Sequence, residues 1–247
     1  MNRRKFLMYL SSVPMVTSDL MANDTDFYLS REEFELIISI NKRLKRLQRH
    51  VGYAHFNIIS YKDALFYARN YPAIGAFTKK ELNFIDRLFY EDATKYGFYG
   101  KKTCTNIDNV VPKKEIVKIP HTGHYLFKGK PHEDYKRIIN DIGADRLKLT
   151  SGIRNVIKQL SLYVNKIYNS GGNMTKATVS LAPPSASYHT ISDFDVGKIG
   201  WGARNFTADF ATTQEFAEMI KLDYVHIRYK KNNKDGVRYE PWHVTVI

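Results

Sequence analysis

The run Glu240-Pro241-Trp242-His243, close to the end of the chain, constrains the fold more than any other segment. It holds a carboxylate three residues before an imidazole, on a stiff Pro-Trp spacer. A second polar run, Ser187 to Val196, contains His189, Asp193 and Asp195. Together the two runs supply two imidazoles, one or two carboxylates for a metal, and a spare glutamate. This is the inventory of a catalytic zinc site, which needs three protein ligands, an open position for water and a general base.

Residues 239–247 alternate like a β-strand, which conflicts with using both ends of this run in one site. In a regular strand, Glu240 and His243 would point to opposite faces. Pro241 must therefore disturb the strand, as prolines do at edges and bulges. The sequence thus predicts irregular backbone at this proline.

Composition and charge indicate a globular protein with a basic surface. A chain of 247 residues, 43% hydrophobic and 13% aromatic, can bury a sizeable core. The formal charge of +13 suits nucleic acid, lipid headgroups or bacterial wall polymers as partners, and it equally suits a solvated surface that serves solubility. Cys104 is the only cysteine, so the chain forms no intramolecular disulfide, and we expect this thiol to be packed rather than catalytic.

The N-terminus resembles an export signal. Asn2-Arg3-Arg4-Lys5-Phe6-Leu7 is similar to the twin-arginine motif, and the apolar stretch from Phe6 to Val16 is too short to span a bilayer. We predict that residues 1–22 are the signal, with a weak cleavage site at Leu20-Met21-Ala22; a basic arm or a retained anchor is the alternative. No other segment reaches spanning length, so the mature chain should have no stable membrane span. We expect an exported protein, periplasmic or associated with the cell wall.

Apolar periodicity and capping signals, such as Ser30 followed by Glu33 and Thr78 followed by Glu81, predict a helical first half and a mixed second half. Helices are predicted over residues 29–50, 60–70, 78–96, 131–143, 154–168 and 212–221, and strands over 146–150, 224–229 and 239–247. Residues 97–130 break into loops and irregular strands, where His121 and His124 are expected at the surface or in a cleft. The predicted division is a helical N-terminal region (23–120) followed by a catalytic domain (121–247).

Three blocks in the second half carry a resemblance to a known family. They are Ser151-Gly152-Ile153-Arg154 with Gln159 downstream, Ser187-x-His189 followed by Asp195, and Glu240-Pro241-Trp242-His243. In this order and spacing they resemble the zinc D-alanyl-D-alanine carboxypeptidases of peptidoglycan, a family that includes vancomycin-resistance carboxypeptidases and phage endolysin peptidases. The resemblance covers roughly Arg146 to Ile247.

The resemblance implies a specific site on an α+β fold, in which a small, mostly antiparallel sheet flanked by helices carries one zinc ion. His189, Asp195 and His243 would be the ligands. Glu240 would be the base that takes a proton from water and later gives it to the leaving amine. Arg154 would hold the substrate carboxylate or the developing oxyanion. Further substrate or bracing contacts are expected from Gln159 and Ser187.

The chain departs from the family pattern in two of the three blocks. We call Ser187 to Asp195 the metal block and Ser151-Gly152-Ile153-Arg154 the arginine block. Asp195 follows His189 by six positions instead of seven, and Ser192 replaces the glycine of the family. Asp193 is therefore a rival ligand, although Phe194-Asp195-Val196 matches the apolar-Asp-apolar strand of the family better. Ile153 replaces the usual tyrosine of the arginine block, which removes an aromatic wall.

The expected activity is hydrolysis of a bond in the peptidoglycan stem peptide, with removal of a terminal D-alanine as the first choice. The alternatives are a DD- or LD-endopeptidase and a non-catalytic wall-binding module on the same fold. Anionic cell-wall polymers fit the basic surface. The basic cluster from Lys42 to Arg49 fits a solvated helix face, and a nucleic-acid-binding helix is the minority interpretation, so no nucleic-acid partner is expected.

Overall fold

The computed structural model describes residues 26–247 of the chain. The predicted export signal, residues 1–22, lies outside this range. Within the described range, no helix has both the length and the hydropathy that a membrane span requires.

Helices dominate the chain up to residue 120. The elements are α1 (Arg31–Val51), α2 (Tyr53–Phe56), α3 (Tyr61–Asn70), α4 (Lys79–Tyr90), and the 3-10 turns η1 (Ala93–Tyr96) and η2 (Lys113–Glu115). Side-chain caps set the helix starts: Ser30 and Glu33 form the predicted capping box of α1, and Thr78 and Glu81 form that of α4. The third predicted helix is shorter than expected, because α4 ends at Tyr90 and the chain turns before η1.

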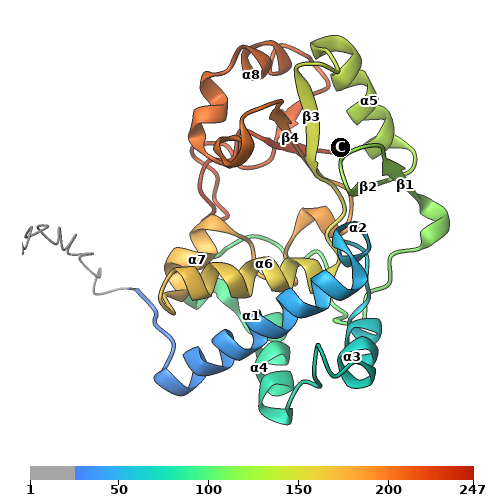
Figure 1. The fold of residues 1–247 in the computed structure, drawn as a ribbon. Coiled ribbons are helices and arrows are strands. Elements are labelled where there is room, and N and C mark those ends of the chain that lie inside the picture. Colours follow the sequence, from blue (N-terminus) through green and yellow to red (C-terminus); the bar gives the residue numbers. More distant parts are fainter. Residues whose placement is uncertain (1–25) are drawn as a thin grey trace, which may run out of the picture.

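These N-terminal helices share one core with two helices from the second half, α6 (Val156–Asn169) and α7 (Met174–Ser180). Ile37 and Leu44 of α1 are fully buried in the same cluster as Leu160 and Val164 of α6. Figure 1 shows α1, α3, α4, α6 and α7 gathered in the lower half of the molecule. The N-terminal region therefore packs directly on the helix that follows the arginine block.

A four-stranded sheet, of which Figure 1 labels β3 and β4, lies in the upper half of the molecule. Its strands are β3 (Leu147–Ser151), β4 (Phe194–Lys198), β5 (His226–Ile227) and β6 (His243–Thr245), in the order β3-β4-β6-β5, and every pair is antiparallel. Figure 1 shows α5 (Lys130–Ile142) and α8 (Gln214–Met219) in the same half. The 3-10 turns in the second half of the chain are η3 (Tyr188–Thr190), η4 (Gly202–Phe206) and η5 (Ala208–Thr212). The predicted α+β class is confirmed.

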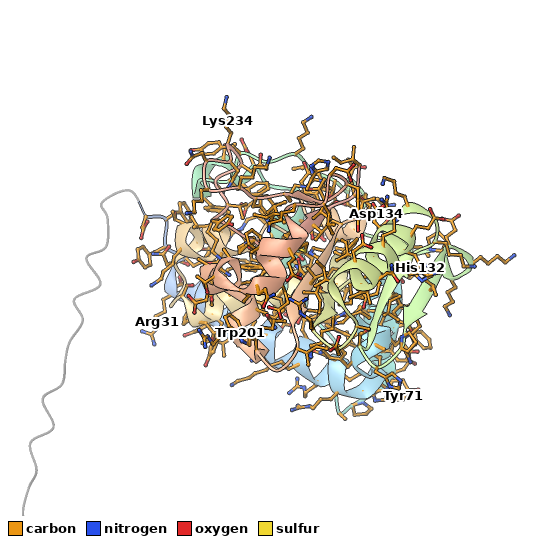
Figure 2. The ribbon with its side chains drawn as sticks, turned by 90° about the horizontal axis from the view of Figure 1, so that it is seen from above. Arg31, Tyr71, His132, Asp134, Trp201 and Lys234 are labelled. Carbon is orange, nitrogen blue, oxygen red and sulfur yellow. The ribbon has the colours of Figure 1, made fainter. Side chains whose placement is uncertain are left out.

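One face of the sheet is apolar and the other carries the polar blocks. Phe194 and Val196 of β4 and Val244 of β6 are buried in a second core together with residues of α5 and α8. Because side chains alternate along a strand, Asp195 and His243 point to the opposite face. In the view of Figure 2, α5 with His132 and Asp134 lies at the opposite side of the molecule from Arg31 at the start of α1.

Two further differences from the sequence-based expectation bear on the site. The irregular segment 97–130 contains a hairpin of β1 (Ile116–Ile119) and β2 (His124–Phe127). The C-terminal strand is short, because β6 begins only at His243. Both differences matter for the site. The hairpin carries His124 to it, and Glu240 lies among the residues that were predicted as strand but precede β6.

Candidate metal centre

His189, Asp195 and His243 come together on the polar face of the sheet. Asp195 and His243 are register partners on the adjacent strands β4 and β6, and His189 lies in η3 just before β4. One potential ligand atom from each residue lies within 4.8 Å of the other two, and all three residues are buried. Asp195 Oδ1 is 3.2 Å from His189 Nε2 and 3.7 Å from His243 Nδ1. The two sequence runs predicted to meet therefore do meet.

The free atoms of this cluster fit a cation. The Nδ1 of His189 lies 2.8 Å from the carbonyl oxygen of Gly152, which can only accept, so the ring proton sits on Nδ1 and Nε2 keeps its lone pair. His189 Nε2 and Asp195 Oδ1 are both buried without a hydrogen-bond partner among residues 26–247. Orphaned buried polar atoms are rare because each carries an uncompensated desolvation penalty. A divalent ion between these atoms would satisfy both.

Glycine at position 152 is required for this arrangement. A Cβ atom at Gly152 would lie 2.0 Å from the carbonyl oxygen of Tyr125, which accepts the backbone N–H of Ile153. The close approach holds the loop against β2 and leaves the Gly152 carbonyl beside His189. The glycine of the arginine block therefore orients a residue of the metal block.

Asp193, the rival ligand, lies behind His243 rather than among the converging atoms. Its Oδ2 is 3.2 Å from His243 Nε2, and its carboxylate also accepts from the guanidinium of Arg228 and from the backbone N–H of Val246. These contacts fix the imidazole so that Nδ1 faces Asp195. Asp193 thus has the position of a carboxylate that orients a metal-binding histidine.

The charges around the cluster set the protonation of its imidazoles. Burial, assisted by the charge of Arg154, lowers the pKa of His189 to about 4, so this ring is neutral at neutral pH, the form that binds metals. Burial also opposes protonation of His243, but hydrogen bonds to the carboxylates of Asp193 and Glu240 outweigh it and raise the pKa to about 9. A metal ion at Nδ1 of His243 would therefore displace a proton.

A β-turn, not a strand, brings Glu240 to the cluster. The backbone N–H of His243 donates to the carbonyl of Glu240 at 3.1 Å, and Pro241 occupies the second position of the turn, where its fixed φ is favoured. The turn places Glu240 Oε2 3.4 Å from His243 Nδ1, on the same side of the chain. The irregular backbone predicted at Pro241 is present, and it resolves the conflict with strand alternation.

Arg154 also reaches the cluster. Its Nη2 donates to Asp195 Oδ2 and its Nε donates to Ser151 Oγ at 2.8 Å. Gln159 and Ser187 are buried away from it: the Gln159 side chain donates to the carbonyl of Ala182 at 2.8 Å, and the Ser187 carbonyl accepts from Thr103. In these positions, Gln159 and Ser187 brace the loop before η3, and their contact with substrate stays a prediction.

A pocket of about 330 Å³ opens beside the cluster. Arg154, Glu240 and Trp242 line it from the predicted site. Three further residues that the sequence did not single out as site residues also line it: Tyr53 of α2, His124 of β2 and Lys158 of α6. Burial lowers the pKa of His124 to about 4, so this ring is neutral as well. For Lys158 a signal existed, because it follows Arg154 by four residues within the helix that the sequence predicts over residues 154–168. Tyr53 arrives through a long-range contact that no local pattern reveals.

Comparison with known proteins supports the resemblance seen in the sequence. Residues 130–246 match the family model described as "VanY: D-alanyl-D-alanine carboxypeptidase", which confirms that resemblance. No curated protein sequence matches the chain. Among solved structures, "Structure of the LdcB LD-carboxypeptidase reveals the molecular basis of peptidoglycan recognition" is 23% identical over 56% of this chain and 70% of that chain, with a TM-score of 0.46. "VanYB in complex with D-Alanine-D-Alanine" is 19% identical over 58% and 84%, with a TM-score of 0.43.

Proposed function

We propose that the chain is a zinc-dependent peptidoglycan peptidase that removes a terminal D-alanine from the stem peptide, because residues 130–246 match the family model of the D-alanyl-D-alanine carboxypeptidases. The protein would act after export, in the periplasm or at the cell wall. Its formal charge of +13 would favour contact with anionic wall polymers.

In this proposal His189 Nε2, Asp195 Oδ1 and His243 Nδ1 hold the ion. A bound zinc ion would polarise the scissile carbonyl and make a water molecule acidic enough to attack near neutral pH. The three protein ligands leave at least one position open, as a catalytic site requires. The gap between the unpartnered Nε2 of His189 and the unpartnered Oδ1 of Asp195 supports this placement.

Glu240 is the proposed base. It is buried, it lines the pocket, and its Oε2 lies 3.4 Å from the proposed ligand atom of His243, within reach of a water molecule bound there. It would take the proton of the attacking water and return it to the leaving amine. Arg154 would stabilise the negative charge that develops on the carbonyl oxygen, with the guanidinium donors that Ser151 and Asp195 leave free.

The observation that carries the proposal is the turn at Pro241, which sets a carboxylate beside a converging set of two imidazoles and a carboxylate. The test compares the full chain with Glu240→Gln, which keeps the size and hydrogen-bonding capacity of the side chain. We expect zinc content and unfolding midpoint close to those of the unmodified protein, and a fall in kcat of at least about a hundredfold, the scale of a lost general base. Retained activity in this variant would refute the assigned base.

The product decides between the two peptidase activities. Digestion of purified muropeptides, followed by mass spectrometry, should show the loss of one terminal alanine. Products cleaved inside the stem or at a cross-link would instead identify the protein as an endopeptidase. No product from a zinc-loaded protein would favour the non-catalytic wall-binding module.

A further inference from the structure

The pocket beside the metal centre carries more positive than negative charge. Its charged lining residues are Arg154, Lys158, Arg238 and Glu240. Arg154 pairs with Asp195, and Arg238 Nε lies 3.9 Å from the Glu240 carboxylate. Lys158 has no ion-pair partner within residues 26–247. The pocket therefore contains a cation whose charge the described part of the chain does not balance.

Lys158 is held in a setting that disfavours its charge. Only 7% of the residue is exposed, and its Nζ lies 5.0 Å from the ring centroid of Tyr53 and 5.8 Å from that of Phe56. Burial, with the nearby charge of Arg154, lowers its pKa to about 8. An ammonium that loses water without gaining a carboxylate is costly, and the two aromatic faces compensate for only part of this loss. A ligand carboxylate would supply the missing partner.

The position of Lys158 relative to the metal centre indicates what it meets. Arg154 lies just before Asn155, the N-cap of α6, and Lys158 lies in the first turn of that helix, so both face the pocket from one end of α6. Arg154 forms an ion pair with Asp195 of the metal centre, whereas within residues 26–247 Lys158 forms none with a carboxylate of that centre. A substrate placed at the metal by Arg154 would therefore extend past Lys158 with a different chemical group.

We propose that Lys158 is a specificity-determining residue that pairs with a carboxylate of the substrate, inside a pocket wall formed by Tyr53 of the N-terminal helical region. This inference rests on the proposed function, since it assumes that the substrate is a peptide seated at the metal centre. Two carboxylates have the required chemistry: the C-terminal one of the peptide, and a side-chain carboxylate of the stem. The N-terminal region, which lies outside the matched residues 130–246, thereby becomes part of substrate recognition.

The test uses one synthetic stem peptide in three forms: with both carboxylates free, with the C-terminus amidated, and with the side-chain carboxylate amidated. The proteins are the zinc-loaded full chain, Lys158→Met, which removes the charge at similar length, and Lys158→Arg, which keeps it. We expect Lys158→Met to raise KM for the free peptide by about tenfold or more, the scale of a hydrogen bond to a charged group, with a smaller change in kcat. Lys158→Arg should retain most of the affinity.

The amides identify the source of the carboxylate. The unmodified protein should have a higher KM for one of the two amides than for the free peptide. In Lys158→Met this difference should disappear, while the KM ratio for the other amide stays as in the unmodified protein. If the acid-to-amide ratios of Lys158→Met equal those of the unmodified protein for both positions, the inference is overturned.

Binding separates this inference from the proposed function. Calorimetry with the same three peptides is carried out on Glu240→Gln, alone and combined with Lys158→Met. Discrimination in binding without hydrolysis by the unmodified protein would overturn the peptidase and leave the carboxylate site standing. Hydrolysis by the unmodified protein, with equal binding of the acid and amide peptides, would support the peptidase and overturn the carboxylate site.

Discussion

Replacement of Lys158 by methionine should make the protein more stable. In the folded chain the ammonium is buried without a carboxylate partner, whereas in the unfolded chain it is fully hydrated. Methionine is apolar, of similar length, and packs well against the rings of Tyr53 and Phe56. The substitution removes a desolvation penalty and retains the contact area.

The size of the effect follows from the pKa of Lys158. Burial lowers this pKa from an ordinary value of 10.5 to about 8. Since each tenfold change in proton affinity is worth about 1.4 kcal/mol, the charged form destabilises the folded state by about 3 kcal/mol. The penalty is complete below pH 8, where the side chain is protonated in both states. It disappears as the pH rises from about 8 to 10.5, because the unfolded chain then holds a proton that the folded chain has lost.

Urea unfolding followed by tryptophan fluorescence measures the difference. At pH 7, Lys158→Met should exceed the unmodified protein by up to about 3 kcal/mol, which at roughly 2–4 °C per kcal/mol also raises the thermal midpoint by several degrees. At pH 9.5 the gain should fall to less than half. Lys158→Arg stays charged and should show no gain. A Lys158→Met protein that is no more stable at pH 7, or whose advantage does not shrink with pH, would refute the reasoning.

Three further predictions concern the metal centre. Gly152→Ala should lower the free energy of unfolding by about 3 kcal/mol or more, because its Cβ would lie 2.0 Å from the Tyr125 carbonyl oxygen; a denaturation curve equal to that of the unmodified protein would contradict the close approach. Asp193→Asn should weaken zinc binding by about 10–100-fold in a chelator competition, because His243 loses the carboxylate that orients it; unchanged affinity would assign Asp193 a purely structural role. Removal of zinc by a chelator should lower the thermal midpoint, and zinc restored at a hundredfold excess over Kd should return about 2.7 kcal/mol; a midpoint insensitive to zinc would exclude a folded-state site.

Local sequence signals predicted the elements well. The pairing of Ser30 with Glu33 marked the start of α1, because a capping box satisfies backbone N–H groups through residues only three apart. The strand at Phe194 to Val196 was instead indicated by the resemblance to the family, and in β4 its alternation buries two side chains and turns Asp195 to the other face. Capping signals act between near neighbours, so the sequence displays them directly.

The arrangement around the site was less accessible, since it depends on contacts between distant segments. Asp193 and Asp195 differ by two positions in a strand-like run, and only the fold shows that the first lies behind His243 and the second beside it. The turn at Pro241 was predicted only as a disturbance of the strand. Its form depends on Trp242 and Val244, both buried in the core beneath the sheet.

The helix α6 links the helical region to the candidate site. Its buried face packs in one core with α1, and its first turn, with the residue before its cap, presents Lys158 and Arg154 to the pocket. A shift of α1 against α6 would therefore move the ammonium of Lys158, the proposed partner of the substrate, together with the guanidinium of Arg154, which pairs with Asp195. Residues 26–120 are thus placed to affect the KM of the proposed peptidase through α6, although the proposed metal ligands all lie outside this segment. For this reason the helical region and the sheet are better understood as one recognition unit than as a catalytic domain with an appendage.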